Sequence, residues 1–118
     1  MHSDPIDVTL DSIRPDRQLH YENYQVVSTV HALCGAITPN MVAISLKCVG
    51  PEVHLYFYLE LESSVDRDEI EDVAAELFAL QFTDVPIVTH VNVAGEQVQH
   101  SEIEGRPIYR RYEASTGA

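Results

Sequence analysis

The residues best suited to chemistry in this sequence are six histidines, two cysteines and many carboxylates. Imidazoles, thiolates and carboxylates ligate transition metals and act as general acids and bases. His54 and His90 fall in segments of alternating polarity, so both could lie on one face of a sheet. No metal-ligand spacing joins them. A small metal-dependent or hydrolytic enzyme built on His54 and His90 is one alternative, but we expect no catalytic site, no resident metal and no cofactor.

The sequence also lacks the motifs that mark common catalytic sites. It contains no GxSxG, Walker loop, GxGxxG or HExxH segment. Cys34 and Cys48 do not form a CxxC pair, and each falls on the apolar face of the element predicted around it. Buried free thiols are poor nucleophiles, because they stay protonated. The sequence thus favours a binding protein over an enzyme.

The charge balance narrows the choice of partner. The chain has 118 residues, with 19 Asp and Glu against 7 Lys and Arg, for a net charge of −12. An acidic surface repels nucleic acid and anionic membranes but attracts a basic protein. No apolar run is long enough to span a bilayer, and the N-terminus lacks the basic and apolar regions of a secretory signal. A cytoplasmic location is therefore expected.

The segment VHLYFYLELE, residues 53–62, must position several of the candidate side chains. Its odd positions are apolar, and its even positions are polar or amphipathic, namely His54, Tyr56, Tyr58, Glu60 and Glu62. This period of two predicts a strand whose odd face lies in a core. The mutation Phe57→Ala should then cost roughly 3–5 kcal/mol of stability, whereas Tyr58→Ala should cost little.

The remaining elements follow from the same kind of pattern. Helices are expected at 21–34, ending at Gly35, and at 66–82, where Asp66 and Glu69 suit a capping box. Strands are also expected at 41–49, 85–93 and 107–113. Spacings of three and four predict the buried positions: Val26, Val30, Leu33, Cys34 and Ile37 in and just after the first helix, and Ile70, Val73, Ala74, Leu77 and Leu80 in the second.

The order helix, strand, strand, helix, strand, strand predicts one α+β domain over residues 19–118, preceded by an extended arm at 1–18. Two hairpins would form a four-stranded, mainly antiparallel sheet, with both helices packed on one face. The other face would be open to solvent or to a partner. It could instead meet a second copy in a homodimer, or be covered by the N-terminal arm as a second, minor core.

The candidate partner-binding residues come from this open face and from the acidic second helix. Tyr and Arg are enriched at protein interfaces, and carboxylates attract a basic partner. The window 60–76 alone holds eight acids and one arginine. The predicted contact residues are Tyr56, Tyr58, Glu60, Glu62, Asp68, Glu69, Asp72, His90, Tyr109 and Arg111.

Four segments of the chain resemble a known group of proteins: ALCGAITPNMVAISL, VHLYFYLE, EIEDVAAELFAL and IYRRYE. They are similar to small acidic bacterial immunity proteins of contact-dependent growth inhibition and related polymorphic toxin systems. The matching positions are Gly35, Pro39, Asn40, Tyr56, Phe57, Tyr58, Glu76, Tyr109, Arg110, Arg111 and Glu113. The resemblance implies a non-catalytic protein that binds and neutralises a cognate toxin of nuclease type, which would carry a basic surface. A homodimeric assembly module is the alternative from a different functional class.

Overall fold

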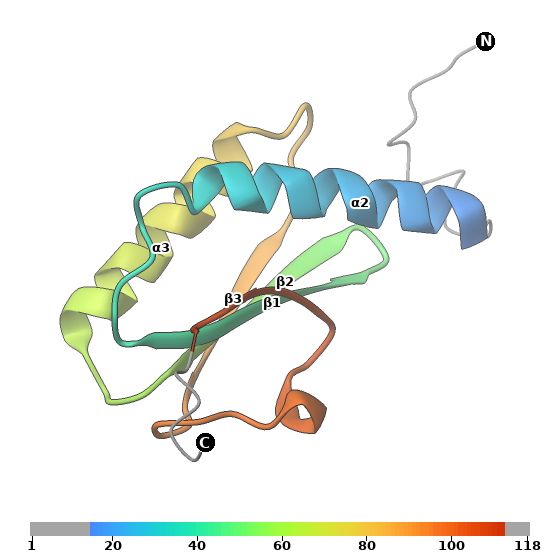
Figure 1. Cartoon of the computed structure of the whole chain (residues 1–118). Coiled ribbons are helices and arrows are strands. Elements are labelled where there is room, and N and C mark those ends of the chain that lie inside the picture. Colours follow the sequence, from blue (N-terminus) through green and yellow to red (C-terminus); the bar gives the residue numbers. More distant parts are fainter. Residues whose placement is uncertain (1–14, 113–118) are drawn as a thin grey trace, which may run out of the picture.

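The computed structural model describes residues 15–112. Its elements are α2 (Pro15–Ala32), β1 (Met41–Val49), β2 (Glu52–Leu59), α3 (Ser64–Ala79), β3 (Ile87–Val93), the short 3-10 helix η1 (His100–Glu102) and β4 (Arg106–Arg110). This order confirms the predicted α+β fold with two helices and four strands (Figure 1). The expected extended arm lies outside the described residues except for 15–18, which belong to α2.

The four strands form one mixed sheet with the order β3-β2-β1-β4. The first predicted hairpin is confirmed, because β1 and β2 pair antiparallel across Gly50 and Pro51. The second predicted hairpin is wrong, because β3 pairs parallel to β2 while β4 pairs antiparallel to β1. The helix α3 crosses over the sheet between β2 and β3, and such a crossover returns the chain in a parallel direction. The strands β3 and β4 therefore form the two opposite edges.

The main core lies between the sheet and the two helices, which cover the same face (Figure 1). The odd positions of β2 from Val53 to Leu59 are fully buried there, as predicted. The predicted stripe of α3 is also confirmed at Ile70, Val73 and Leu77. Leu61 is 66% exposed, because β2 ends two residues before it. The alternation of the sequence thus located the core face, but it continued beyond the end of the strand.

The buried face predicted for the first helix is confirmed at Leu33, which is buried, and at Val26, which packs against the main core, but it is wrong at the other three positions. Val30 is 53% exposed and Ile37 is 39% exposed, and Cys34 is also exposed. The buried positions include Tyr21 and Gln25 instead. Both have polar partners: the Tyr21 hydroxyl donates to the Pro51 carbonyl at 2.8 Å, and the Gln25 and Gln81 amides exchange hydrogen bonds of 2.8 and 3.0 Å. A polar residue can be buried at little cost when it is hydrogen-bonded, and the aliphatic residues are left on the outer side.

The helix α3 begins one turn earlier than predicted. Its N-cap is Ser63, whose hydroxyl accepts a hydrogen bond from the Asp66 N–H at 3.1 Å. Asp66, the predicted cap, is a buried residue of the first turn, and its carboxylate accepts from the Asn40 side-chain amide at 2.8 Å. The capping box was therefore wrong in position, although Ser and Asp are both preferred caps.

A bulge in β1 changes which residues face the helices. The register with β2 shifts between Met41 and Ala43. Met41 and Ile44 point into the main core, while Val42 and Ala43 join a second cluster on the other face. Strict alternation over residues 41–49 would place Val42 on the helix face with Ile44, and this expectation is wrong because a bulge inserts one extra residue and inverts the alternation.

The second face of the sheet is partly covered rather than open. Residues 94–105, which connect β3 to β4 and contain η1, run beneath the sheet on the side away from the helices (Figure 1). Val98 and Ile103 from this connection pack against Val42, Ala43 and Tyr58. A second, minor core is therefore present, but the 94–105 loop forms its cover.

No helix among residues 15–112 is long and apolar enough to cross a bilayer.

Candidate partner-binding surface

The exposed end of the second face carries a stack of three rings from β2 and β3. Tyr56 and His90 are opposite each other in the parallel register, and their ring centroids are 4.5 Å apart with an interplanar angle of 11°. His54 stacks on His90 at 5.1 Å, and its Nδ1 is 2.8 Å from His90 Nε2. The prediction that His54 and His90 share one sheet face is confirmed.

Three imidazole nitrogens of this stack, both of His54 and the Nε2 of His90, have hydrogen-bond partners within the protein. Glu52 accepts from His54 Nε2 at 3.0 Å, because a carboxylate oxygen can only accept. Neutral His54 therefore accepts at Nδ1 from the Nε2–H of His90. No group of three or more His, Cys, Asp or Glu side chains in the part of the chain that the structure describes could hold a metal ion. The arrangement is a half-buried aromatic platform.

Tyr58, the next residue on the same side of β2, is closed off from solvent. It is only 3% exposed, beneath the 94–105 loop. Its hydroxyl accepts from the Glu104 N–H at 2.8 Å and donates to the Glu102 carbonyl at 3.4 Å. The expectation of an open face is therefore wrong at Tyr58, because the loop supplies both apolar cover and hydrogen-bond partners.

The charged residues at the end of β2 form local ion pairs. Arg111 donates to Glu60 at 2.9 Å, and also to the carbonyls of Pro39 and Glu96 at 2.9 and 2.8 Å. The Glu62 carboxylate accepts two hydrogen bonds from Arg67 at 2.6 and 2.8 Å, which lower its pKa. Glu60, Glu62 and Arg111 thus fasten chain segments to one another, and their charges are compensated. Glu113, the matching position at the end of the last predicted strand, lies outside the described residues.

Tyr109 lies on the opposite side of the sheet from the one predicted. It packs against the main core beside Ile108, in the groove next to the end of α2. The pairing of β4 with β1 is irregular between Ile44 and Ser45. Tyr109 is opposite Ile44, which points into the main core, so Tyr109 does not lie on the exposed sheet face that the sequence pattern predicted.

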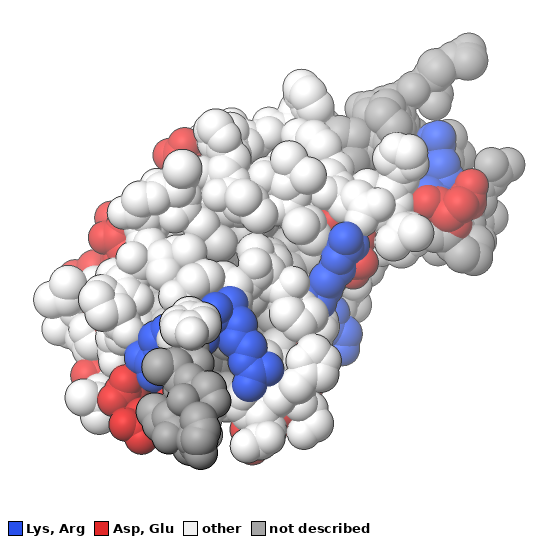
Figure 2. Space-filling model, in the orientation of Figure 1, with Lys and Arg blue, Asp and Glu red and all other residues white. Residues whose placement is uncertain are grey.

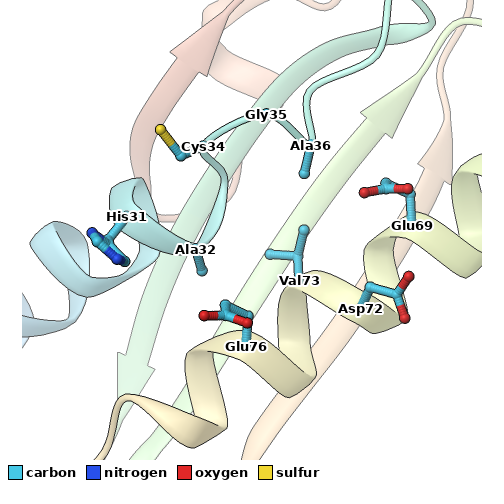
Figure 3. A pocket seen from close by; sticks show the side chains of 9 residues that line it. All are labelled: His31, Ala32, Cys34, Gly35, Ala36, Glu69, Asp72, Val73 and Glu76. Atoms are coloured by element: carbon cyan, nitrogen blue, oxygen red, sulfur yellow. The ribbon is translucent and has the colours of Figure 1, made fainter.

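The acidic helix α3 has uncompensated carboxylates on the side that faces the end of α2. Glu69, Asp72 and Glu76 line a hollow of about 380 Å³ between the two helices. Figure 3 shows the Glu69 and Glu76 carboxylates directed across the hollow toward the end of α2, with Asp72 turned outward. None of these three carboxylates forms an ion pair with any residue that the structure describes. Asp68 is exposed on the same helix but does not line the hollow.

The opposite wall of this acidic hollow was missed by sequence reasoning. It consists of His31, Ala32 and the turn Cys34–Ala36 at the end of α2. Gly35 has a φ of +81°, a conformation that glycine adopts without strain and that ends helices. The sequence signal for this turn was the glycine itself. The packing of α2 on α3, which closes the hollow, has no local signal.

Comparison with known proteins identifies the family. A search of curated proteins found no match to the chain. A family model described as MafI2 immunity protein matches residues 22–113, which include most of α2 and every later element. Immunity proteins are typically non-catalytic and have a cognate toxin as their partner. Because the match covers most of its length, the chain belongs to the MafI2 immunity protein family, whose function is to neutralise a toxin.

Proposed function

We propose that this immunity protein neutralises a nuclease-type toxin of a contact-dependent or related polymorphic toxin system by binding the toxin's basic surface. The observation that carries the proposal is the acidic hollow, where Glu69, Asp72 and Glu76 lie together without ion-pair partners among the described residues. A nuclease needs cationic side chains to bind phosphates. An inhibitor with clustered carboxylates can occupy those side chains in place of the nucleic acid.

The distribution of charge supports this choice of surface. Other acids near the sheet are paired, as in Glu60 with Arg111 and Glu62 with Arg67. The net charge of −12 adds a long-range attraction for a cationic partner. Electrostatic attraction of this kind raises association rates well above the values for neutral pairs. Glu69, Asp72 and Glu76 form no ion pair among residues 15–112 and lie together at one hollow, so they offer a clustered site for the cations of a toxin.

The predicted contact residues divide into three groups under this proposal. Glu69 and Asp72, with Asp68 beside them, contribute to the binding surface, and Glu76 joins them. Tyr56 and His90 form a separate, half-buried patch on the sheet, and contact there stays a prediction. The remaining five have contacts within the protein: Tyr58 with the 94–105 loop, Glu60 with Arg111, Glu62 with Arg67, and Tyr109 with the main core.

Co-expression with the toxin encoded beside its gene tests the proposal. Wild-type protein should protect cells and should form a complex that co-purifies. The variant Glu69→Gln/Asp72→Asn/Glu76→Gln should lose most of this protection, since it keeps the shape of the hollow and removes its charge.

A control removes the same amount of charge elsewhere. Asp16→Asn/Asp84→Asn/Glu96→Gln alters three exposed acids outside the acidic hollow and should protect as well as wild type. Cell death with wild-type protein, and no complex, would refute neutralisation of this toxin. Equal loss of protection in both variants would refute the role of the hollow and leave only a general effect of charge.

A further inference from the structure

A second hollow lies on the other side of the turn that bounds the acidic one. It has a volume of about 330 Å³ and lies between the end of α2 and the edge strand β4. Its side chains are apolar or aromatic: Val30, Leu33, Ile37, Ile108 and Tyr109. We call it the apolar groove. Single exposed aliphatic residues are common on protein surfaces, but these five come from three segments and converge on one concavity.

The two hollows share one wall. Cys34 and Gly35 line both of them, so the turn forms a ridge with the apolar groove on one side and the acidic hollow on the other. Gly35 has no side chain, and a Cβ built there would meet nothing within 4 Å, so nothing stands above the ridge at this point. Figure 2 shows an uncharged area along α2, with acidic side chains at the α3 edge of the same view. An apolar centre beside a charged rim is the usual composition of a protein interface.

We propose that the toxin docks across the Cys34–Gly35 ridge and inserts an aliphatic or aromatic side chain into the apolar groove while its neighbouring Lys or Arg side chains enter the acidic hollow. This inference rests on the proposed function and adds the chemistry of the contacting segment: one apolar anchor flanked by cations. The apolar anchor supplies binding energy by burial, and the cations set the orientation across the ridge.

The charges argue for a basic partner rather than a second copy of this chain. Within the described residues, Lys47, Arg67, Arg106 and Arg111 already form ion pairs, and these are four of the seven Lys and Arg in the sequence. A second copy would also bring another net charge of −12 toward the acidic hollow. Like charges brought together at an interface are destabilising. A copy of the chain could fill the apolar groove only by placing its own acids nearby.

The two cysteines provide a probe of the ridge. Cys34 is exposed on it, whereas Cys48 is half-buried in β1 beside the main core. Burial raises the pKa of the Cys48 thiol to about 12, and the nearby Glu22 carboxylate adds to this shift. The thiolate is the reactive form, so at pH 7.5 N-ethylmaleimide should modify Cys34 and leave Cys48 as an internal control. Mass spectrometry of the peptides distinguishes the two sites.

The footprinting experiment compares the free protein with its complex. The partner used is the toxin encoded beside the gene, inactivated by a substitution in its own active site. Docking across the ridge should slow the modification of Cys34 by at least about tenfold, because a buried thiol is not accessible to the reagent. Slow modification of Cys34 in the free protein at high concentration, restored by dilution, would instead assign the apolar groove to a second copy and overturn the proposal.

A pair of variants tests the apolar groove separately from the charge. Val30→Gln/Ile37→Gln replaces two exposed aliphatic residues of the groove with uncharged polar ones. The matched control is Val27→Gln/Val49→Gln, which changes two valines that are at least as exposed as the groove pair and do not line the groove. The groove variant should bind the inactivated toxin at least about tenfold more weakly, and the control should bind within about twofold of wild type.

The outcomes separate the docking site from the function. A complex that forms with wild-type affinity in the groove variant, and in which Cys34 reacts as fast as in the free protein, overturns the docking site and leaves neutralisation intact. Absence of any complex with the wild-type protein overturns the proposed function itself. Circular dichroism spectra and thermal midpoints equal to wild type would show that a weaker complex does not result from unfolding.

Discussion

At the scale of single residues, Tyr58 shows most clearly how context decides a side chain's role. Its neighbours on the even face, His54 and Tyr56, are partly exposed, and the period of two suggested the same for Tyr58. The 94–105 loop covers it and bonds to its hydroxyl. Sequence alternation distinguishes the two faces of a strand, but it does not indicate which face a distant loop will cover. The predicted low cost of Tyr58→Ala is therefore revised.

The hydroxyl of Tyr58 should contribute to stability through its two hydrogen bonds. Tyr58→Phe should lower the free energy of unfolding by about 1–2 kcal/mol, because the Glu104 N–H loses its acceptor and the Glu102 carbonyl loses a donor in a partly buried site. Urea denaturation followed by circular dichroism measures the change. Tyr56→Phe is the control and should stay within about 0.5 kcal/mol of wild type, since its side chain is partly exposed. Equal values for both variants would mean that the loop does not hold Tyr58.

At the scale of elements, the strand β2 and the helix α3 were predictable because the sequence of each has a regular period, and β1 was predictable except at its bulge. The buried face of α2 was predictable only in part, at Val26 and Leu33. Its inner side carries Tyr21 and Gln25, whose burial depends on partners far along the chain, Pro51 and Gln81. Hydrophobic spacing alone cannot anticipate such partners. The exposed aliphatic residues that misled the prediction, Val30 and Ile37, are the same residues that line the apolar groove.

The 94–105 loop should depend on the glycine at its end, where the chain lies close to β1. It ends at Gly105, which has a φ of +70° and would place a Cβ against the Leu46 backbone. Gly50 has a similar φ of +58°, with open space around it. Gly50→Ala should destabilise the protein by about 1 kcal/mol through its backbone conformation alone. Gly105→Ala should cost a further ~1–3 kcal/mol, since the methyl group must displace the loop from the sheet.

Urea denaturation of the two glycine variants distinguishes the cost of the positive φ from the cost of the contact with the Leu46 backbone. If the two glycine variants are equally destabilised, the loop is not packed closely against β1 at Leu46. A loosened loop should also raise the accessibility of Tyr58, which hydrogen exchange at the Glu104 amide would detect. If the Glu104 amide is protected equally in Gly105→Ala and in wild type, the close packing of Gly105 against β1 does not hold the 94–105 loop over the second face.

At the scale of the whole molecule, the fold class was predictable and the strand order was not. The order of helices and strands and the charge of −12 can be read from the sequence. The pairing of β4 with β1 depends on a connection that crosses the sheet to its far edge, and no local pattern encodes that path. The candidate site, like the fold, could be predicted from the sequence only in part. The acids of α3 are evident from the sequence, whereas the wall that makes them line a hollow comes from tertiary packing with α2.

We expect Glu69, Asp72 and Glu76, which form no ion pair among the described residues, to guide this MafI2-family protein onto a basic toxin. Stopped-flow association with the inactivated toxin, measured from low to high salt, tests this claim. We expect the association rate to fall by about tenfold or more as salt rises, and the Glu69→Gln/Asp72→Asn/Glu76→Gln variant to lose most of that dependence. The Asp16→Asn/Asp84→Asn/Glu96→Gln control should keep it. An association rate that responds neither to salt nor to the Glu69, Asp72 and Glu76 substitutions would contradict the claim.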